Sequence, residues 1–290
     1  MVKLFCSTFF TGSLWRWLTG SVGALAALFL IGKNIFNFNI FYSILIGVGV
    51  LLAVLILSFI YFLLTNIHRR SRYGEAIVLL KDGFAGINKL KRDSSDNSEE
   101  IMRTMVEMCN TLKAVFDKIT KVDCSVSIKI PIINSPISSN AVVENICRDY
   151  KHYLIRNTDA YKNLEHRVNG STAYQVIINN VLNGNESKFF YLNNNVPKTK
   201  DYQTTSRSAY LDGKLPYKSE LVYPILPLLP PAGASSNGMK SKYEIWGFLC
   251  VDCDHTNKFN EHYHVPIIQG VADGVFDVIM KINKSRTLTN

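Results

Sequence analysis

The sequence predicts an α+β protein in which an antiparallel sheet with flanking helices follows a two-helix transmembrane hairpin and a helical connector. Three observations predict this architecture. The six Lys and Arg residues of 1–74 have no acidic residue among them, residues 40–64 are almost wholly apolar, and β-branched runs alternate with amphipathic stretches downstream. We expect four parts: a hairpin at 1–67, a connector at 68–97, a domain at 98–283 and a tail at 284–290.

The positive charge of the chain is concentrated in its first quarter. Downstream of residue 74, 26 Lys or Arg residues face 23 Asp or Glu residues, so most of the net charge of +9 lies before that point. This distribution disfavours a basic soluble domain that binds a nucleic-acid polymer. The lipid bilayer is instead the expected partner of the N-terminal part.

Two apolar segments predict the hairpin, at about 14–32 and 40–64. The second has 25 residues, and a helix of that length spans about 37 Å, enough for a hydrocarbon core of ~30 Å. The first has 16 residues between Arg16 and Lys33, so both cations must extend outward for it to span. A signal peptide is the alternative, although Ala24 and Ala26 lie inside the apolar run instead of after it.

The flanking charges predict the orientation. Arg69, Arg70 and Arg72 follow the second segment, Lys3 and Arg16 precede the apolar run of the first, and Lys33 lies between the two. The positive-inside rule then places the chain in the plasma (inner) membrane as a multi-pass protein with both termini in the cytoplasm. Neither segment has an ionisable residue at its centre, so we expect an anchor or an assembling effector instead of a transporter.

A connector helix and a second helix are expected next. Apolar residues at 77, 80, 84 and 87 repeat at helical spacing, and Asn97 with Glu100 resembles a helix cap with its box partner. Seven apolar residues from 101 to 122 then alternate at spacings of four and three. Two interpretations stay open: this seam packs on its own domain, or it forms a homodimer through residues 101–122 that carries signals.

The domain itself is expected to contain strands at 124–133, 189–192, 220–226 and 243–252. Helices are expected at 171–182, which Asn183 and Gly184 end, and at 259–282, whose apolar residues share one face. The segment 227–241 is rich in Pro, Gly and Ser, which predicts an exposed hairpin loop.

Two of these strands resemble a known family. Residues 217–225 (YKSELVYPI) and 245–252 (IWGFLCVD), between a helix and a long final helix, are similar to paired strands of GAF domains over residues 98–283. The resemblance implies a six-stranded antiparallel sheet, with helices on one face and a small-molecule pocket on the other. GAF domains bind cyclic nucleotides, tetrapyrroles, haem, amino acids or metabolites, or serve only as dimer modules, so the ligand or cofactor stays open.

Strand alternation indicates which side chains share a face. Glu220 and Val222 point to one side of their strand, and Phe248, Cys250 and Asp252 point together on the next. The resemblance implies a pocket roofed by residues 193–210; the alternative is a solvated loop over a pocket filled with side chains. The candidate ligand-binding residues are Asn193, Asn194, Tyr210, Tyr217, Ser219, Glu220, Cys250 and Asp252.

Two further motifs are interpreted as structural. Residues 257–261 (NKFNE) match a signature of cyclic-nucleotide phosphodiesterase GAF domains, but that family disperses these residues along the chain, so we expect Asn260 only to cap the last helix. Cys250 and Cys253 form a Cys-x-x-Cys pair whose thiols should point to opposite faces of a strand, which disfavours a redox or zinc site.

An enzyme is also disfavoured. Residues 219–224 resemble a strand of free methionine sulfoxide reductases, and Glu220 and Asp252 match that family's substrate-facing carboxylates. However, residues 186–218 contain no cysteine, and Cys250 stands where an acidic residue is expected. Without the thiolate nucleophile that reaction cannot begin.

The sequence therefore predicts a membrane-anchored sensor with a GAF-like domain that binds a nucleotide or metabolite. The alternative is a ligand-free, membrane-anchored dimerisation scaffold that recruits another protein.

Overall fold

The computed structural model describes residues 40–92, 97–133, 135–156, 158, 164–210, 213–227 and 243–289, together with Gly20 and Gly23. Contacts divide the chain into two compact units, Met1–Ser71 and Arg72–Asn290. Apart from the two glycines, which are helical, the expected first span at 14–32 lies outside the described residues, as do residues 228–241 of the expected hairpin loop.

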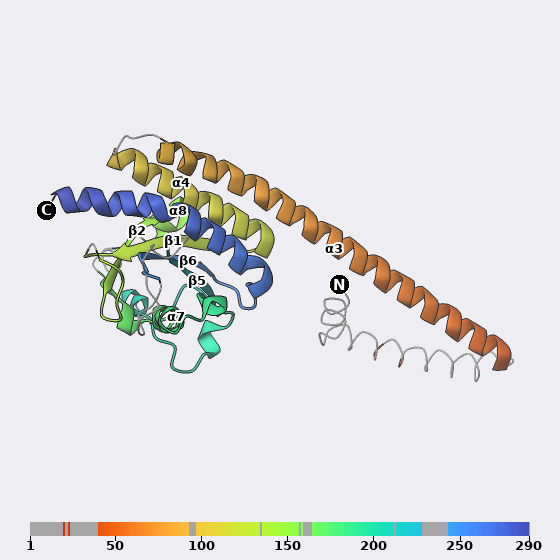
Figure 1. The fold of residues 1–290 in the computed structure, drawn as a ribbon. Helices are drawn as coiled ribbons and strands as arrows, with labels where there is room; N and C mark the ends of the chain where they lie inside the picture. Colours follow the sequence, from red (N-terminus) through yellow and green to blue (C-terminus); the bar gives the residue numbers. More distant parts are fainter. Residues whose placement is uncertain are drawn as a thin grey trace. The chain divides into compact units, whose positions relative to one another are not determined.

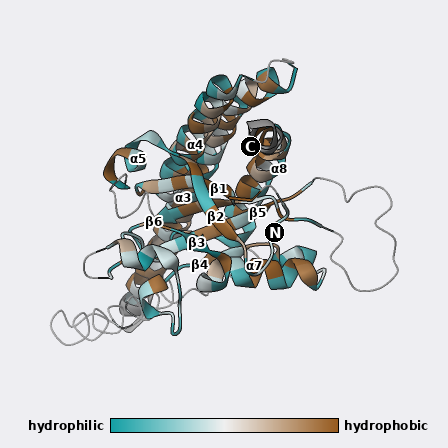
Figure 2. Ribbon diagram, turned by 90° about the vertical axis from the view of Figure 1, so that its left-hand side faces the viewer, coloured by the Kyte–Doolittle hydropathy of each residue, from teal (hydrophilic) through white to brown (hydrophobic). Residues whose placement is uncertain are grey.

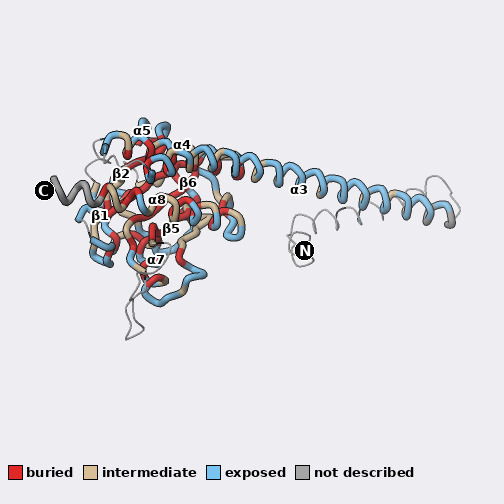
Figure 3. The backbone as a smooth tube through the Cα atoms, turned by 45° about the horizontal axis from the view of Figure 1, so that its top comes forward, coloured by how far each residue is buried: buried red, intermediate tan, exposed pale blue. Residues whose placement is uncertain are grey.

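The expected second span and residues 68–92 of the expected connector are helical and belong to one helix, α3 (Ile40–Arg92). Within the described residues it is one helix that is long and apolar enough to cross a membrane. Most described residues along its first part are exposed (Figure 3); for example, Leu57 is 66% exposed. Its last part is different, because Ala76, Ile87 and Leu90 are buried in the core of the second unit.

The second unit is built on one antiparallel sheet of six strands, in the order β3-β2-β1-β6-β5-β4. This is the sheet that the resemblance implies. The two central strands, β1 and β6, are buried on both faces. The bounds are β1 Cys124–Pro131, β2 Val142–Arg148, β3 His166–Arg167, β4 Tyr191–Asn193, β5 Ser219–Ile225 and β6 Gly247–Cys253.

Helices α4 (Ser98–Thr120) and α8 (Glu261–Thr289) cover one face of this sheet, with the end of α3 beside them (Figure 1). Hydrophobic and hydrophilic residues alternate along both helices (Figure 2). Asn97 caps α4 as expected, with its side-chain oxygen 3.0 Å from the backbone nitrogen of Glu99 and 3.4 Å from that of Glu100. The Glu100 side chain, however, bonds Lys89 of α3 at 3.2 Å instead of completing the capping box.

The apolar seam of α4 is filled by the protein's own core. Met105, Met108, Leu112 and Val115 are each 0–1% exposed and lie in the cluster formed with the sheet and α8. The interpretation that the seam packs on its own domain is therefore confirmed. A homodimer through residues 101–122 stays a prediction, and it would have to use side chains of α4 other than these four, because intramolecular packing already covers them.

The opposite face of the sheet is covered by α7 (Thr172–Leu182) and by the 3-10 helices η1 (Val168–Gly170), η2 (Glu186–Lys188), η3 (Val196–Lys198) and η4 (Thr205–Ala209). Helix α5 (Tyr150–Arg156) begins beside α4, where the Tyr150 N–H donates to Asn110 at 2.8 Å. A second apolar cluster joins α7 to Val143, Val222 and Phe248 of the sheet. The two thiols of the Cys-x-x-Cys pair lie on opposite faces as expected, since Cys250 belongs to this cluster and Cys253 to the other. Asn260 also caps α8, accepting from the backbone of His262 at 3.0 Å.

Candidate functional site

The face of the sheet under α7 contains polar and charged side chains in the interior of the domain. Strand register explains why they gather: Glu220 is paired with Asp252, Asp252 with Ser125, and Cys250 with both Val222 and Ser127. Paired residues of antiparallel strands point to the same side of the sheet. We call this set the buried polar face; it comprises Ser125, Ser127, Lys129, Asn145, Arg148, Glu220, Cys250 and Asp252.

Asp252 is bound by an arginine that the sequence did not indicate. Arg156 of α5 reaches its carboxylate with two nitrogens, at 2.8 and 3.1 Å, and both residues are less than 10% exposed. A bidentate pair of this kind satisfies both carboxylate oxygens with good geometry. Asp252 is therefore engaged inside the protein, and Arg156 is the partner that holds it.

Glu220 lies in a tyrosine network. The Tyr202 hydroxyl donates to Glu220 Oε2 at 2.7 Å, and the hydroxyls of Tyr202 and Tyr217 are 3.0 Å apart. Burial, with a contribution from the charge of Asp252, raises the pKa of Glu220 to about 7, although the Tyr202 hydrogen bond and the charge of Lys129 act in the opposite direction. Near neutral pH, a small change in the surroundings of this carboxyl is therefore enough to change its protonation state.

Lys129 is the most unusual member of the buried polar face. It is 6% exposed, and its ammonium lies 5.7 Å from the ring centroid of Tyr174. Tyr174 stacks on Phe248 with centroids 4.3 Å apart. Burial, together with the charges of Lys129 and Arg148, lowers the pKa of nearby His166 to about 2, so this imidazole is neutral at physiological pH.

Of the predicted site residues, Asn193 and Asn194 make hydrogen bonds that hold the segment after β4 in place. Asn193 bonds Thr199 and the Tyr191 hydroxyl within its own turn, at 2.9 and 3.0 Å. Asn194 donates to the carbonyl of Phe259 at 2.7 Å and accepts from its N–H at 2.9 Å. Both asparagine side chains therefore make hydrogen bonds that stabilise the fold.

Ser219 also makes structural contacts, on the opposite side of β5 from Glu220. Its hydroxyl lies 2.7 Å from the carbonyl oxygen of His255 and 3.1 Å from that of Asn194. Tyr210 is half-buried at the end of η4, where its carbonyl accepts from Gly213 at 2.8 Å.

Cys250 and Tyr217 do lie with Glu220 and Asp252. Burial raises the pKa of the Cys250 thiol to about 11, so it is protonated at neutral pH, and its sulfur is 3.9 Å from the Tyr174 hydroxyl. The structure thus brings together Tyr217, Glu220, Cys250 and Asp252 from the predicted set.

Sequence reasoning missed the basic members of the face. Ser125, Ser127 and Lys129 alternate with the apolar residues of β1, which is a signal of a strand with one polar face. Such a pattern ordinarily indicates a face toward water. Here α7 covers it, and the partners from β2, β3 and α5 came from segments for which no element was predicted.

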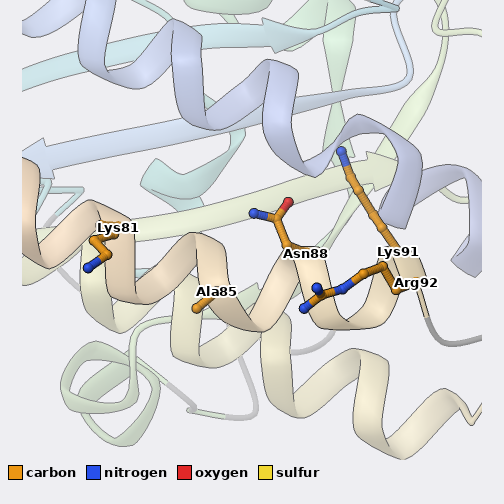
Figure 4. A pocket seen from close by; sticks show the side chains of 5 residues that line it. All are labelled: Lys81, Ala85, Asn88, Lys91 and Arg92. Atoms are coloured by element: carbon orange, nitrogen blue, oxygen red, sulfur yellow. The ribbon is translucent and has the colours of Figure 1, made fainter.

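A separate open groove of about 530 Å³ lies on α3 and is lined by Lys81, Ala85, Asn88, Lys91 and Arg92 (Figure 4). Lys91 points from α3 toward α8, where it pairs with Asp277 at 2.9 Å. This groove is on the helical side of the sheet and shares no residue with the buried polar face.

Comparisons with known proteins give structural similarities alone. No protein-family model and no curated protein matches the chain. Among solved structures, the GAF domain of an Acinetobacter phosphoenolpyruvate-protein phosphotransferase is 12% identical, with a TM-score of 0.43, over 73% of this chain and 98% of that one. The corresponding domain from Coxiella burnetii is 11% identical, with a TM-score of 0.39, over 74% and 98%.

A third similar structure is the type II free methionine-R-sulfoxide reductase of Thermoplasma acidophilum, 16% identical with a TM-score of 0.38, over 62% of this chain and 93% of that one. The fold is GAF-like. That statement rests on the six-stranded antiparallel sheet of this chain and on the helical layer of α4 and α8 against one face of it.

Proposed function

We propose that the protein is a membrane-anchored sensor whose GAF-like domain binds a small polar molecule at the buried polar face. The observation that carries the proposal is the gathering of Lys129, Glu220 and Asp252 under α7, where each is largely buried. A domain that only scaffolds gains nothing from charges in this position, because each costs free energy to remove from water. A site that recognises a polar ligand requires such groups.

The anchor in this proposal is α3, assisted by the predicted first span, with both termini in the cytoplasm. The apolar residues of α3 are followed by Arg69, Arg70 and Arg72, and positive residues of this kind mark the cytoplasmic side. A homodimer through residues 101–122 stays a prediction, and it would have to use outward residues of α4 such as Arg103 and Glu107, which are exposed.

Strand β1 connects the site to the helices. Ser127 and Lys129 belong to the buried polar face, whereas Val126 and Ile128 of the same strand pack into the core that contains α4. Helix α4 in turn contacts the last part of α3 through the ion pairs Lys118–Glu75 and Lys89–Glu100. A ligand that binds two arrangements of these elements with tenfold different affinity shifts their balance by about 1.4 kcal/mol.

Two alternatives each have an observation in their favour. For a ligand-free scaffold, Tyr174, Tyr202, Tyr217 and Phe248 occupy much of the layer between the sheet and its cover. For a methionine sulfoxide reductase, the Thermoplasma structure has a similar fold. We propose that the chain is not such an enzyme, since the Cys250 thiol on this face is protonated and a thiolate is needed for attack.

The test uses the full chain in lipid nanodiscs. The protein is denatured, the released small molecules are identified by mass spectrometry, and the same compounds are screened for an increase in melting temperature. A ligand at 100 times its dissociation constant adds about 2.7 kcal/mol of stability. Glu220→Gln should weaken the response, and the exposed Glu244→Gln should not. A folded protein that releases nothing and responds to no compound would favour the scaffold.

A further inference from the structure

Two neighbouring polar groups on the buried polar face lack hydrogen-bond partners among the described residues. Lys129 and Asn145 are opposite each other in the pairing of β1 with β2. The Oδ1 atom of Asn145 is buried and accepts no hydrogen bond from any residue that the structure describes. Among the described residues the Lys129 ammonium makes no hydrogen bond or ion pair, and its contact is the Tyr174 ring.

These two groups are costly as they stand. A buried polar atom without a hydrogen bond costs about 1–3 kcal/mol, and a buried charge costs more. The Tyr174 ring offsets part of that cost for Lys129, because an ammonium over an aromatic face is attracted by about 0.5–2 kcal/mol. The ring offers no lone pair to the three N–H donors of the ammonium, and it donates no hydrogen bond to Asn145 Oδ1.

The carboxylates nearby are already engaged. Asp252 is held by both nitrogens of Arg156, and Glu220 accepts from Tyr202. Neither carboxylate forms an ion pair with the Lys129 ammonium. His166 lies near Lys129 and brings no charge, because burial and the charge of Lys129 lower its pKa to about 2.

The unmet needs of the two groups are complementary. Lys129 requires an acceptor, best an anion, and Asn145 Oδ1 requires a donor, and the two sit at one register position. A carboxylate satisfies the ammonium, and an N–H or O–H on the adjacent atom satisfies the amide oxygen.

We propose that Lys129 and Asn145 form the subsite that selects the sensor's ligand, a small carboxylic acid with a hydrogen-bond donor next to its carboxylate. Lys129 binds the carboxylate, and Asn145 Oδ1 accepts from the neighbouring hydroxyl or amino group. This assignment rests on the proposed function, whose site it specifies. It also accounts for the position of a lysine in the central strand of the domain.

The test measures melting temperatures and binding isotherms of the full chain in nanodiscs with three probes. Glycolate has a carboxylate and an adjacent hydroxyl, acetate has the carboxylate alone, and glycolamide has the hydroxyl without the charge. We expect glycolate to bind more tightly than acetate, and glycolamide to give no response. Loss of the ammonium in Lys129→Met should lower the affinity for glycolate by about tenfold or more.

Asn145→Leu tests the second group separately, because it should abolish the preference for glycolate over acetate while both still bind. The exposed Lys218→Met is the matched control and should bind as the wild type does. Should Lys129→Met fail to fold, Lys129→Gln replaces it. Equal glycolate binding by the wild type and the Lys129 variant, or no glycolate binding by the wild type, overturns the subsite.

These outcomes separate the subsite from the sensor. A released or screened compound that stabilises the wild type and the Lys129 variant equally would leave the sensor standing and remove this subsite. A wild type that responds to no compound would remove both.

Discussion

At the scale of the residue, Glu220 shows how the covered face of a sheet changes the chemistry of a side chain. Its strand partner is Asp252, and its hydrogen-bond donor is Tyr202. Burial raises its pKa to about 7, well above the ordinary value of 4.5. The carboxyl is therefore more stable in the protonated form inside the folded protein than in the unfolded chain.

This pKa predicts a pH-dependent stability. The contribution of a group whose folded pKa is raised is fully present below pH 4.5 and is lost as the pH rises through 7. The free energy of unfolding of the wild type should therefore fall relative to that of Glu220→Gln between about pH 4.5 and 8. Chemical unfolding at several pH values checks this, with Glu244→Gln expected to follow the wild type. Parallel curves for the wild type and Glu220→Gln would contradict it.

A second prediction at this scale concerns the pair of Arg156 and Asp252. Replacing Asp252 by Asn leaves a buried guanidinium without its counter-charge, which should cost about 3–5 kcal/mol of stability. The double variant Arg156→Leu with Asp252→Leu should recover most of that loss, because both charges of the pair are then removed together. Unfolding of the single and double variants gives the coupling energy, and additive effects would show that the pair is not coupled.

At the scale of the element, the helical layer depends on close approach between α3 and α8. A Cβ placed on Gly274 of α8 would overlap the ring of Phe84 on α3, whereas a Cβ on Gly270 would meet open space. Glycine at 274 therefore allows these helices to pack. Alternation of apolar residues predicts that α8 is amphipathic, but it does not show which of its glycines faces a neighbour.

Gly274→Ala should destabilise the protein by about 1–3 kcal/mol, as overpacking of a core does. Gly270→Ala on the same helix should be neutral or stabilise by up to about 1 kcal/mol, since alanine favours a helix more than glycine. Adding Phe84→Leu should relieve the first variant. Thermal unfolding distinguishes the three, and equal effects of the two alanines would disprove the contact.

At the scale of the whole molecule, the apolar part of α3 is the feature that concerns membrane association. The apolar part of α3 is exposed in the protein itself, with Leu52 at 54% and Phe59 at 55%. A bilayer satisfies such a surface, whereas water does not.

The chain should therefore remain with membranes after an alkaline carbonate wash. Leu52→Arg with Ile56→Arg places two charges near the centre of the apolar run 40–64, at a cost of about 2.5–3.5 kcal/mol each in a bilayer. This variant should be released from the membranes by the wash. The exposed pair Lys188→Arg with Lys200→Arg should leave retention unchanged. Release of the wild type by the wash would contradict the anchor.

The sequence by itself determined what depends on local periodicity. The length of the apolar run predicted a membrane-compatible helix. Alternation grouped Glu220 with Val222 on one strand and Cys250 with Asp252 on the next, and it separated Cys250 from Cys253. These features follow from the geometry of a single helix or a single strand, which neighbouring residues alone establish.

Only the tertiary structure decided what covers each face. The polar residues of β1 could equally have faced water, and the seam of α4 could have met a second copy; instead α7 covers the first and the protein's own core fills the second. Arg156 and Asn145 come from segments with weak local signals. Asn145 reaches the site because β2 pairs with β1, and Arg156 reaches it through its hydrogen bonds to Asp252, 96 residues further along the chain. The physical reason is that periodicity shows which side of an element is apolar or polar, but the burial of that side depends on contacts far apart in the chain.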